Sequence, residues 1–295
     1  MRCPHVSGDV SFFFVIYVSS SPEKYYICCP MKKNAGDICF FAGLALAFVI
    51  QAACGDFPEE VFAFPVNAAV LFFFVVLLVV LHREKPSSAL CRYLASARTS
   101  LILFVCLALS CLILGLFSQT GGDLLGFRHV KYSWWFVYLM TAFMANILMV
   151  LITRPFRLRF LLNHLGLFLA LAGSFAGSPD KSSVKMKLTT DPTADMYLTD
   201  FRVEYSPNGV PSDFHAEIVV DSKNASLKVN HPYPRTPFVD IYLLDYDKAS
   251  QKPAYCIVEL VKQPWKYVVW TGVVMMMCGA ALLFIQGVNK EGRTV

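Results

Sequence analysis

Six long apolar segments constrain this chain more than any other feature of its sequence. Each is long enough, or nearly so, to cross about 30 Å of hydrocarbon as an α-helix, which takes roughly 17 to 25 residues. Irregular backbone in lipid would leave polar groups without partners, and the segments lack the period-two alternation of membrane β-barrels. We therefore predict six transmembrane helices, over residues 38–54, 62–81, 101–117, 134–152, 160–176 and 267–285.

The composition is typical of a membrane protein and argues against a soluble enzyme or a disordered chain. Of the 295 residues, 56% are hydrophobic and only 16% are charged, whereas a soluble domain usually carries about 25% charge. The net charge of +5 is too small to indicate a nucleic-acid partner, and we predict none. The ten cysteines form no CxxC or CxxCH motif and no zinc-site spacing.

The distribution of basic residues between the apolar segments predicts the orientation. Lys and Arg gather after the second and fourth segments, at Arg83, Lys85, Arg92, Arg98, Arg154, Arg157 and Arg159. Acidic residues dominate after the first segment, at Asp56, Glu59 and Glu60. Since cytoplasmic loops carry the excess of Lys and Arg, we expect both termini in the cytoplasm of a bacterium. The chain would then be a multi-pass protein of the inner membrane, in contact with lipid, with residues 178–266 in the periplasm.

The first thirty residues precede the first predicted helix and are harder to interpret. Their apolar stretch, residues 9–17, is too short to span a membrane. Two interpretations stay open: a signal peptide, or an extension upstream of a natural bacterial start at Met31. We predict four parts: an N-terminal segment 1–37, a five-helix region 38–177, an exported domain 178–266, and a last helix with its tail 267–295.

The composition changes abruptly between the fifth and sixth apolar segments. Apolar and polar residues now alternate, and Gly, Pro and Asn mark turns such as 206–209 and 221–224. Five short strands are predicted, over 197–205, 214–220, 226–229, 238–245 and 255–262. The expected fold is a membrane α-helical bundle with an exported antiparallel β domain, a sheet or sandwich, inserted between the last two helices. Cys256 is the only thiol of that domain, so we expect no internal disulfide there, with Cys54 the one plausible partner.

His164 carries the main functional hypothesis because it lies within the fifth apolar segment. An ionisable residue inside a membrane helix indicates a functional site by default. At helical spacing His164 shares a face with Phe168, Leu171 and Phe175. A histidine among aromatic residues suits an axial ligand of haem iron, with Phe168 and Phe175 lining the pocket. The alternative is a histidine that hydrogen-bonds a neighbouring helix or reaches the headgroups.

Other polar and small residues of the apolar segments favour packing roles. Gly166, Gly173 and Gly177 form a small-residue stripe opposite His164, suited to close helix packing. Gln51 and Asn146 are predicted to join helices by hydrogen bonds. We interpret Trp134-Trp135, Trp265 and Trp270 as aromatic anchors at the membrane interface, and His231, which precedes a proline, as part of a turn. No catalytic residue is predicted.

Several short motifs, taken in order, resemble the ResB (also CcsB) proteins of system II cytochrome c biogenesis. They cover roughly residues 99 to 287. The motifs are Ser133-Trp134-Trp135-Phe136, Phe160-Leu161-Leu162-Asn163-His164-Leu165-Gly166-Leu167, Leu198-Thr199-Asp200-Phe201-Arg202-Val203-Glu204-Tyr205, Val229-Asn230-His231-Pro232 and Pro264-Trp265-Lys266-Tyr267.

The resemblance implies an accessory subunit of a haem lyase complex. With a CcsA/ResC-type partner, such proteins carry haem across the membrane to apocytochrome c, whose two thiols add to the haem vinyl groups. Thiol-reducing proteins act in the same pathway. His164 matches the position of a membrane histidine that ligates haem in fused relatives. The sequence departs from that family at two places on the predicted exported side: Trp134-Trp135 lacks the following Asp of the haem-handling loop, and Tyr132 stands where many relatives carry His.

Two further hypotheses compete with a haem-handling subunit. The chain can be an accessory subunit of a transporter, or a permease, whose exported β domain contacts a carrier protein. It can also be a scaffold that stabilises its partner without binding haem. A haem absorption band that depends on His164 would distinguish the first hypothesis from these two.

Overall fold

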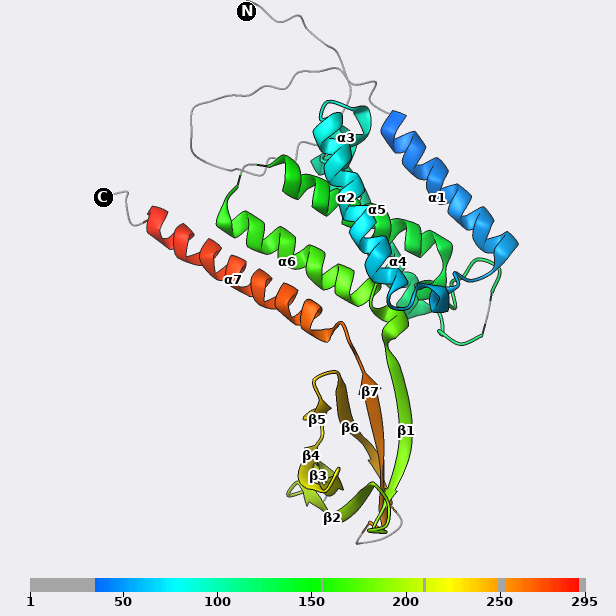
Figure 1. The fold of residues 1–295 in the computed structure, drawn as a ribbon, viewed down its shortest axis with the longest axis vertical. Coiled ribbons are helices and arrows are strands. Elements are labelled where there is room, and N and C mark those ends of the chain that lie inside the picture. The colour runs from blue at the N-terminus through cyan, green and yellow to red at the C-terminus, as the bar shows by residue number, and fades with distance from the viewer. Residues whose placement is uncertain (1–34, 122, 155, 209–210, 249–252, 292–295) are drawn as a thin grey trace, which may run out of the picture. The chain divides into compact units, whose positions relative to one another are not determined.

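The computed structural model describes residues 35–121, 123–154, 156–208, 211–248 and 253–291, with side chains left out at 211 and 286–291 (Figure 1). The question of residues 1–30 lies outside this part of the chain. Six described helices are long and apolar enough to cross a membrane, which confirms the prediction of a multi-pass membrane protein. They are α1 (Ala35–Cys54), α2 (Val66–Glu84), α4 (Ala97–Leu116), α5 (Trp134–Thr153), α6 (Leu158–Phe175) and α7 (Lys266–Glu291).

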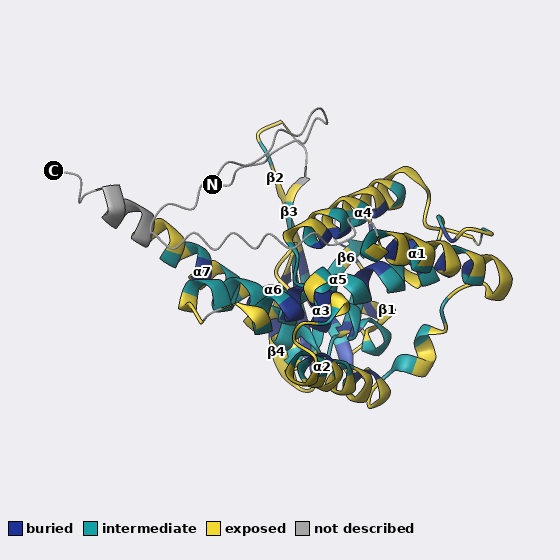
Figure 2. Cartoon of the chain, turned by 90° about the horizontal axis from the view of Figure 1, so that it is seen from above, coloured by how far each residue is buried: buried dark blue, intermediate teal, exposed yellow. Residues whose placement is uncertain are grey.

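The helices present apolar side chains outward as well as inward. Exposed and half-buried residues cover most of α2 and α4 (Figure 2), including Phe72, Phe73 and Phe104. A helix that is apolar all round is stable when lipid is its solvent. The exception is α5, which has the most buried residues of these helices and contributes to two apolar clusters, one with Phe40 of α1 and one with Phe168 of α6.

The second helix begins later than predicted, and a short helix follows it that was not predicted. Residues Glu59–Phe62 form a 3-10 turn, η1, and α2 begins only at Val66, directly after Pro65. Proline disfavours a helical conformation in the residue before it, here Phe64, and the α-helix accordingly begins after Pro65. The short helix α3 (Ala89–Leu94) is capped at its N-terminus by Ser88, whose hydroxyl accepts a hydrogen bond from the Cys91 N–H.

The segment between α6 and α7 folds into two antiparallel sheets that share one apolar core. This confirms the predicted antiparallel β domain between the last two helices. In one sheet the strand order is β1 (Ser182–Thr189), β7 (Tyr255–Lys262), β6 (Val239–Tyr246) and β5 (Tyr233–Thr236). In the other the order is β2 (Met196–Tyr205), β3 (Pro211–Val220) and β4 (Lys223–Lys228). The strands β1 and β7, which join the domain to α6 and α7, lie side by side (Figure 1).

Two strands and one turn differ from the sequence prediction. The strands β1 and β5 were not predicted, because β1 buries only Leu188 and β5 buries none of its residues, so neither shows a clear core-facing pattern. The turn over 221–224 is shorter than predicted. Asp221 and Ser222 both have positive φ, as a two-residue hairpin turn between right-twisted strands requires, so β4 already begins at Lys223.

Cys256 lies in the core of the β domain. Its side chain is fully buried among residues of both sheets, and this burial raises the pKa of the thiol to about 11. Cys54, at the end of α1, is exposed, and both cysteines are free thiols in the structure. A thiol enclosed by apolar neighbours and held in its protonated form is a poor nucleophile, so Cys256 acts as a small core residue.

Candidate functional site

The helix that carries His164 is held against α7 by small residues. A Cβ added at Gly166 would lie 2.6 Å from the carbonyl oxygen of Gly272, and one at Gly173 would lie 2.8 Å from a methyl group of Val269. At Gly177 an added Cβ would meet the Trp265 side chain at 2.5 Å. The predicted small-residue stripe is therefore confirmed as the surface on which α6 packs against α7.

His164 is half-buried. Its ring stacks on Phe160, one turn earlier in α6, and also contacts the backbone of that residue. The two rings stack with their centroids 4.0 Å apart, and Nδ1 lies 3.0 Å from the Phe160 carbonyl oxygen. A carbonyl oxygen can only accept a hydrogen bond, so in a neutral ring this contact requires the proton on Nδ1 and leaves the lone pair on Nε2. This is the arrangement in which a histidine binds a metal ion through Nε2 while its other nitrogen donates to the backbone.

The two phenylalanines predicted with His164 lie in different surroundings. Phe168 is buried in the apolar cluster between α5 and α6, one turn beyond His164. Phe175 is the last residue of α6, about 16 Å along the helix axis from His164 at 1.5 Å per residue. The structure therefore places Phe168 near His164 along α6 and Phe175 at the opposite end of the helix.

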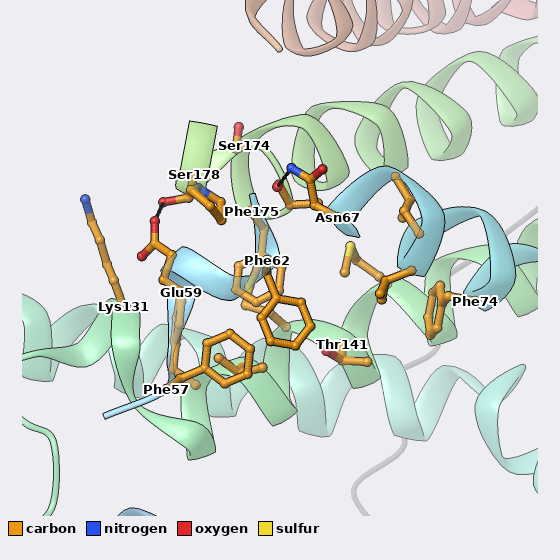
Figure 3. A pocket seen from close by; sticks show the side chains of 18 residues that line it. Phe57, Glu59, Phe62, Asn67, Phe74, Lys131, Thr141, Ser174, Phe175 and Ser178 are labelled. Atoms are coloured by element: carbon orange, nitrogen blue, oxygen red, sulfur yellow. Dashed lines mark hydrogen bonds between the residues drawn. The ribbon is translucent and has the colours of Figure 1, made fainter. Parts of the chain in front are cut away.

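Phe175 instead lines a cavity of about 520 Å³ at the end of α6 (Figure 3). Its walls come from α2, α5, the end of α6 and the turns next to these helices, and most of the lining residues are apolar. They include the rings of Phe57, Phe62, Phe74, Phe136 and Phe175 and the side chains of Met140 and Met144. We call this space the aromatic cavity. Neither His164 nor Phe168 lines it.

The two charged residues of the aromatic cavity, Glu59 and Lys131, lie together at one end of it. Figure 3 shows Glu59 and Lys131 toward one end of the labelled side chains and Phe74 toward the other. Glu59 accepts a hydrogen bond of 3.0 Å from the Ser178 hydroxyl. The cavity volume falls in the range of small-molecule sites, and a few polar groups beside an apolar wall suit an amphipathic ligand.

One carboxylate, Asp180, ties together the segments that border this cavity. It accepts hydrogen bonds from the Phe64 N–H at 2.7 Å, the Asn67 amide at 2.7 Å and the Trp265 indole at 2.6 Å. Burial alone would raise the pKa of Asp180, but these three donors outweigh it and hold the pKa below its ordinary value. Asn67, which is buried, also donates to the Ala176 carbonyl. The start of α2, the end of α6 and the start of α7 are thereby joined.

The roles of Asn67 and Asp180 in this network were not predicted from the sequence. Asn67 is a polar residue within an apolar segment, and that signal was sufficient to indicate a functional or packing role for it. Asp180 follows α6 in a polar turn and had no distinguishing pattern. Its importance depends on contacts with residues more than one hundred positions away.

The predicted packing roles of two other polar residues are confirmed. Gln51 of α1 accepts a hydrogen bond from the Trp134 N–H at the start of α5, and Asn146 of α5 accepts one from the Ser100 hydroxyl of α4. The interface-anchor prediction is wrong for Trp135, which is buried and stacks on Phe48 of α1 with ring centroids 5.4 Å apart. Its position at the beginning of a helix could not show which way the ring faces.

Comparison with known proteins links the chain to one family. The model of the ResB-like family matches residues 157–259, and the chain resembles that family over this part. A solved structure titled "Cytochrome c Heme Lyase CcmF" is similar at 17% sequence identity with a TM-score of 0.35. That similarity covers 83% of this chain and 44% of the other, so the chain spans less than half the length of that protein. No curated protein matches the sequence.

Proposed function

We propose that this chain is a ResB-like subunit of a system II cytochrome c synthetase. In this proposal it works with a CcsA/ResC-type membrane partner to carry haem across the bacterial inner membrane for attachment to apocytochrome c.

The observation that carries the proposal is the family match, which begins one residue before α6 and extends into β7. The match supports a role in cytochrome c biogenesis, and its range includes His164.

Haem is the cargo of this proposed pathway, and His164 is the residue proposed to hold its iron within the membrane. The hydrogen bond from Nδ1 to the Phe160 carbonyl orients the ring and leaves Nε2 free to coordinate. Phe160, stacked on the imidazole, limits its rotation. Phe168 is proposed as an apolar wall one turn away, whereas Phe175, about 16 Å along the helix, is assigned to the aromatic cavity.

The cytoplasmic location proposed for the His164 end of α6 follows from charge. Arg154 and Arg157 lie between α5 and α6, and Arg159 is the second residue of α6. The excess of Lys and Arg marks the cytoplasmic side. His164 would then lie near the compartment in which haem is made, and the β domain would lie in the periplasm.

This orientation predicts the activity of reporter fusions. A reporter that is active only in the periplasm should be active when fused after Asp221, in the β domain, and silent when fused after Arg92, in α3. Enzyme activity in intact cells measures both, with immunoblots to show equal amounts of the two fusions. The opposite pattern would show that the chain lies the other way across the membrane.

A maturation assay tests the proposed function. A host without its own c-type cytochrome maturation system should attach haem covalently to apocytochrome c when this chain and a CcsA/ResC-type partner are both present. Haem staining of denatured protein measures the product, and each protein expressed alone is the control. Equal maturation by the partner alone, at equal partner abundance, would contradict the proposal. If this chain increases maturation only by increasing the amount of the partner, the scaffold hypothesis is favoured instead.

A further inference from the structure

Three side chains that can bind a metal ion converge on the outer face of the β2–β3 hairpin, away from both places described above. They are Glu204 of β2 and Asp213 and His215 of β3. We propose that they form a site for a divalent transition-metal cation of the Zn²⁺ type. The proposed function does not use this cluster, and the inference does not depend on it.

The distances between the ligand atoms suit such an ion. Nε2 of His215 lies 3.3 Å from a carboxylate oxygen of Glu204 and 3.3 Å from one of Asp213. The three ligand atoms all lie within 4.8 Å of one another. Zinc binds histidine nitrogen and carboxylate oxygen at about 2.0–2.2 Å in tetrahedral geometry, which holds neighbouring ligand atoms about 3.3–3.5 Å apart. The three ligand atoms are therefore close enough together to coordinate one ion without a rearrangement of the backbone.

The strand register holds these side chains together. Glu204 pairs directly with Asp213, and His215 pairs with Arg202, so the three ligands share one face of the hairpin. Two carboxylates placed directly opposite each other destabilise a pair of strands unless a cation lies between them. The pairing is continuous from Asp200 to Glu204 of β2, and such a ladder fixes the directions of the ligands better than a loop does.

The histidine nitrogen at the centre of the cluster lacks a hydrogen bond. Nε2 of His215 is inaccessible to solvent and makes no hydrogen bond in the structure, although both carboxylates approach to 3.3 Å. A buried polar atom without a hydrogen bond is costly. Coordination of a metal ion would satisfy this nitrogen and neutralise the two carboxylates at once.

The ligand set, one imidazole and two carboxylates, favours a small transition-metal cation over one that needs many oxygen ligands. Arg202 lies beside the cluster but directs its guanidinium at Asp200, and the exposed Lys228 of β4 pairs with His215 on the other side. Calcium takes six to eight oxygen ligands, which this face does not supply. Three ligands that include one imidazole suit zinc, with water in the fourth position. The competing arrangement is a protonated His215 paired with the two carboxylates.

Zinc titration of the full-length chain in detergent distinguishes these arrangements. Isothermal titration calorimetry at pH 7.5 should show one Zn²⁺ equivalent that is lost in His215→Ala and at least tenfold weaker in Glu204→Gln. His231→Ala, which removes an exposed histidine from another turn of the same domain, should keep this equivalent. Glu204 is 64% exposed, so its variant should fold normally, as circular dichroism would verify. Identical Zn²⁺ stoichiometry and affinity in the three variants and the parent would overturn the proposal and leave only the ion pair.

Discussion

If the proposed function is right, replacing His164 with alanine is expected to remove most of the haem that copurifies with this chain and a CcsA/ResC-type partner, and to abolish cytochrome c maturation. The methyl group of alanine cannot coordinate iron, whereas Nε2 of the present ring has a free lone pair directed away from its own helix backbone. The absorption spectrum of the purified complex measures the haem, and haem staining of the cytochrome measures maturation.

Two further observations separate coordination from packing at this position. Imidazole added to the His164→Ala complex should restore part of the haem, because it can occupy the vacated coordination position. His164→Cys should retain some haem, since a thiolate also ligates haem iron. The matched control is His231→Ala, outside the membrane helices, which should keep the haem content of the parent. Normal haem and an unchanged spectrum in His164→Ala would show that His164 is a packing residue, and the scaffold hypothesis would replace the proposed site.

Replacing Gly166 with valine is expected to destabilise the protein by about 3 kcal/mol or more, because the new side chain would enter the backbone of α7. The Cβ atom alone would lie 2.6 Å from the Gly272 carbonyl oxygen, and a backbone atom cannot move aside as a flexible side chain can. The two helices would have to separate, which would remove contacts along their whole length. Resistance to unfolding by denaturing detergent measures the effect.

Gly115 is the matched control for this substitution. It lies in α4, and a Cβ added there would meet no atom within 4 Å. Gly115→Val should therefore leave the stability close to that of the parent protein. Equal stability of Gly166→Val and Gly115→Val would contradict the close packing of α6 on α7.

The sequence alone predicted the elements whose cause is local. A long apolar segment has only one way to satisfy its backbone in lipid, so the six membrane helices followed from composition and length. The β domain followed from the change to alternating polarity between the last two of them. The small residues at Gly166 and Gly173 indicated a packing surface because helical spacing puts them on one face.

Only the tertiary structure decided which distant residues meet. The hydrogen bonds that join Asp180 to Asn67 and Trp265 connect three segments, and no local pattern relates them. The aromatic cavity likewise takes its walls from α2, α5 and the end of α6, and it separates Phe175 from His164.

The same division holds for the β domain, where strand register matters as much as strand position. Glu204, Asp213 and His215 converge because of one particular pairing of β2 with β3. A shift of one residue would turn one strand's ligands to the other face of the sheet. The local sequence indicated β2 and β3, but pairing across the hairpin decided that these three side chains share one face.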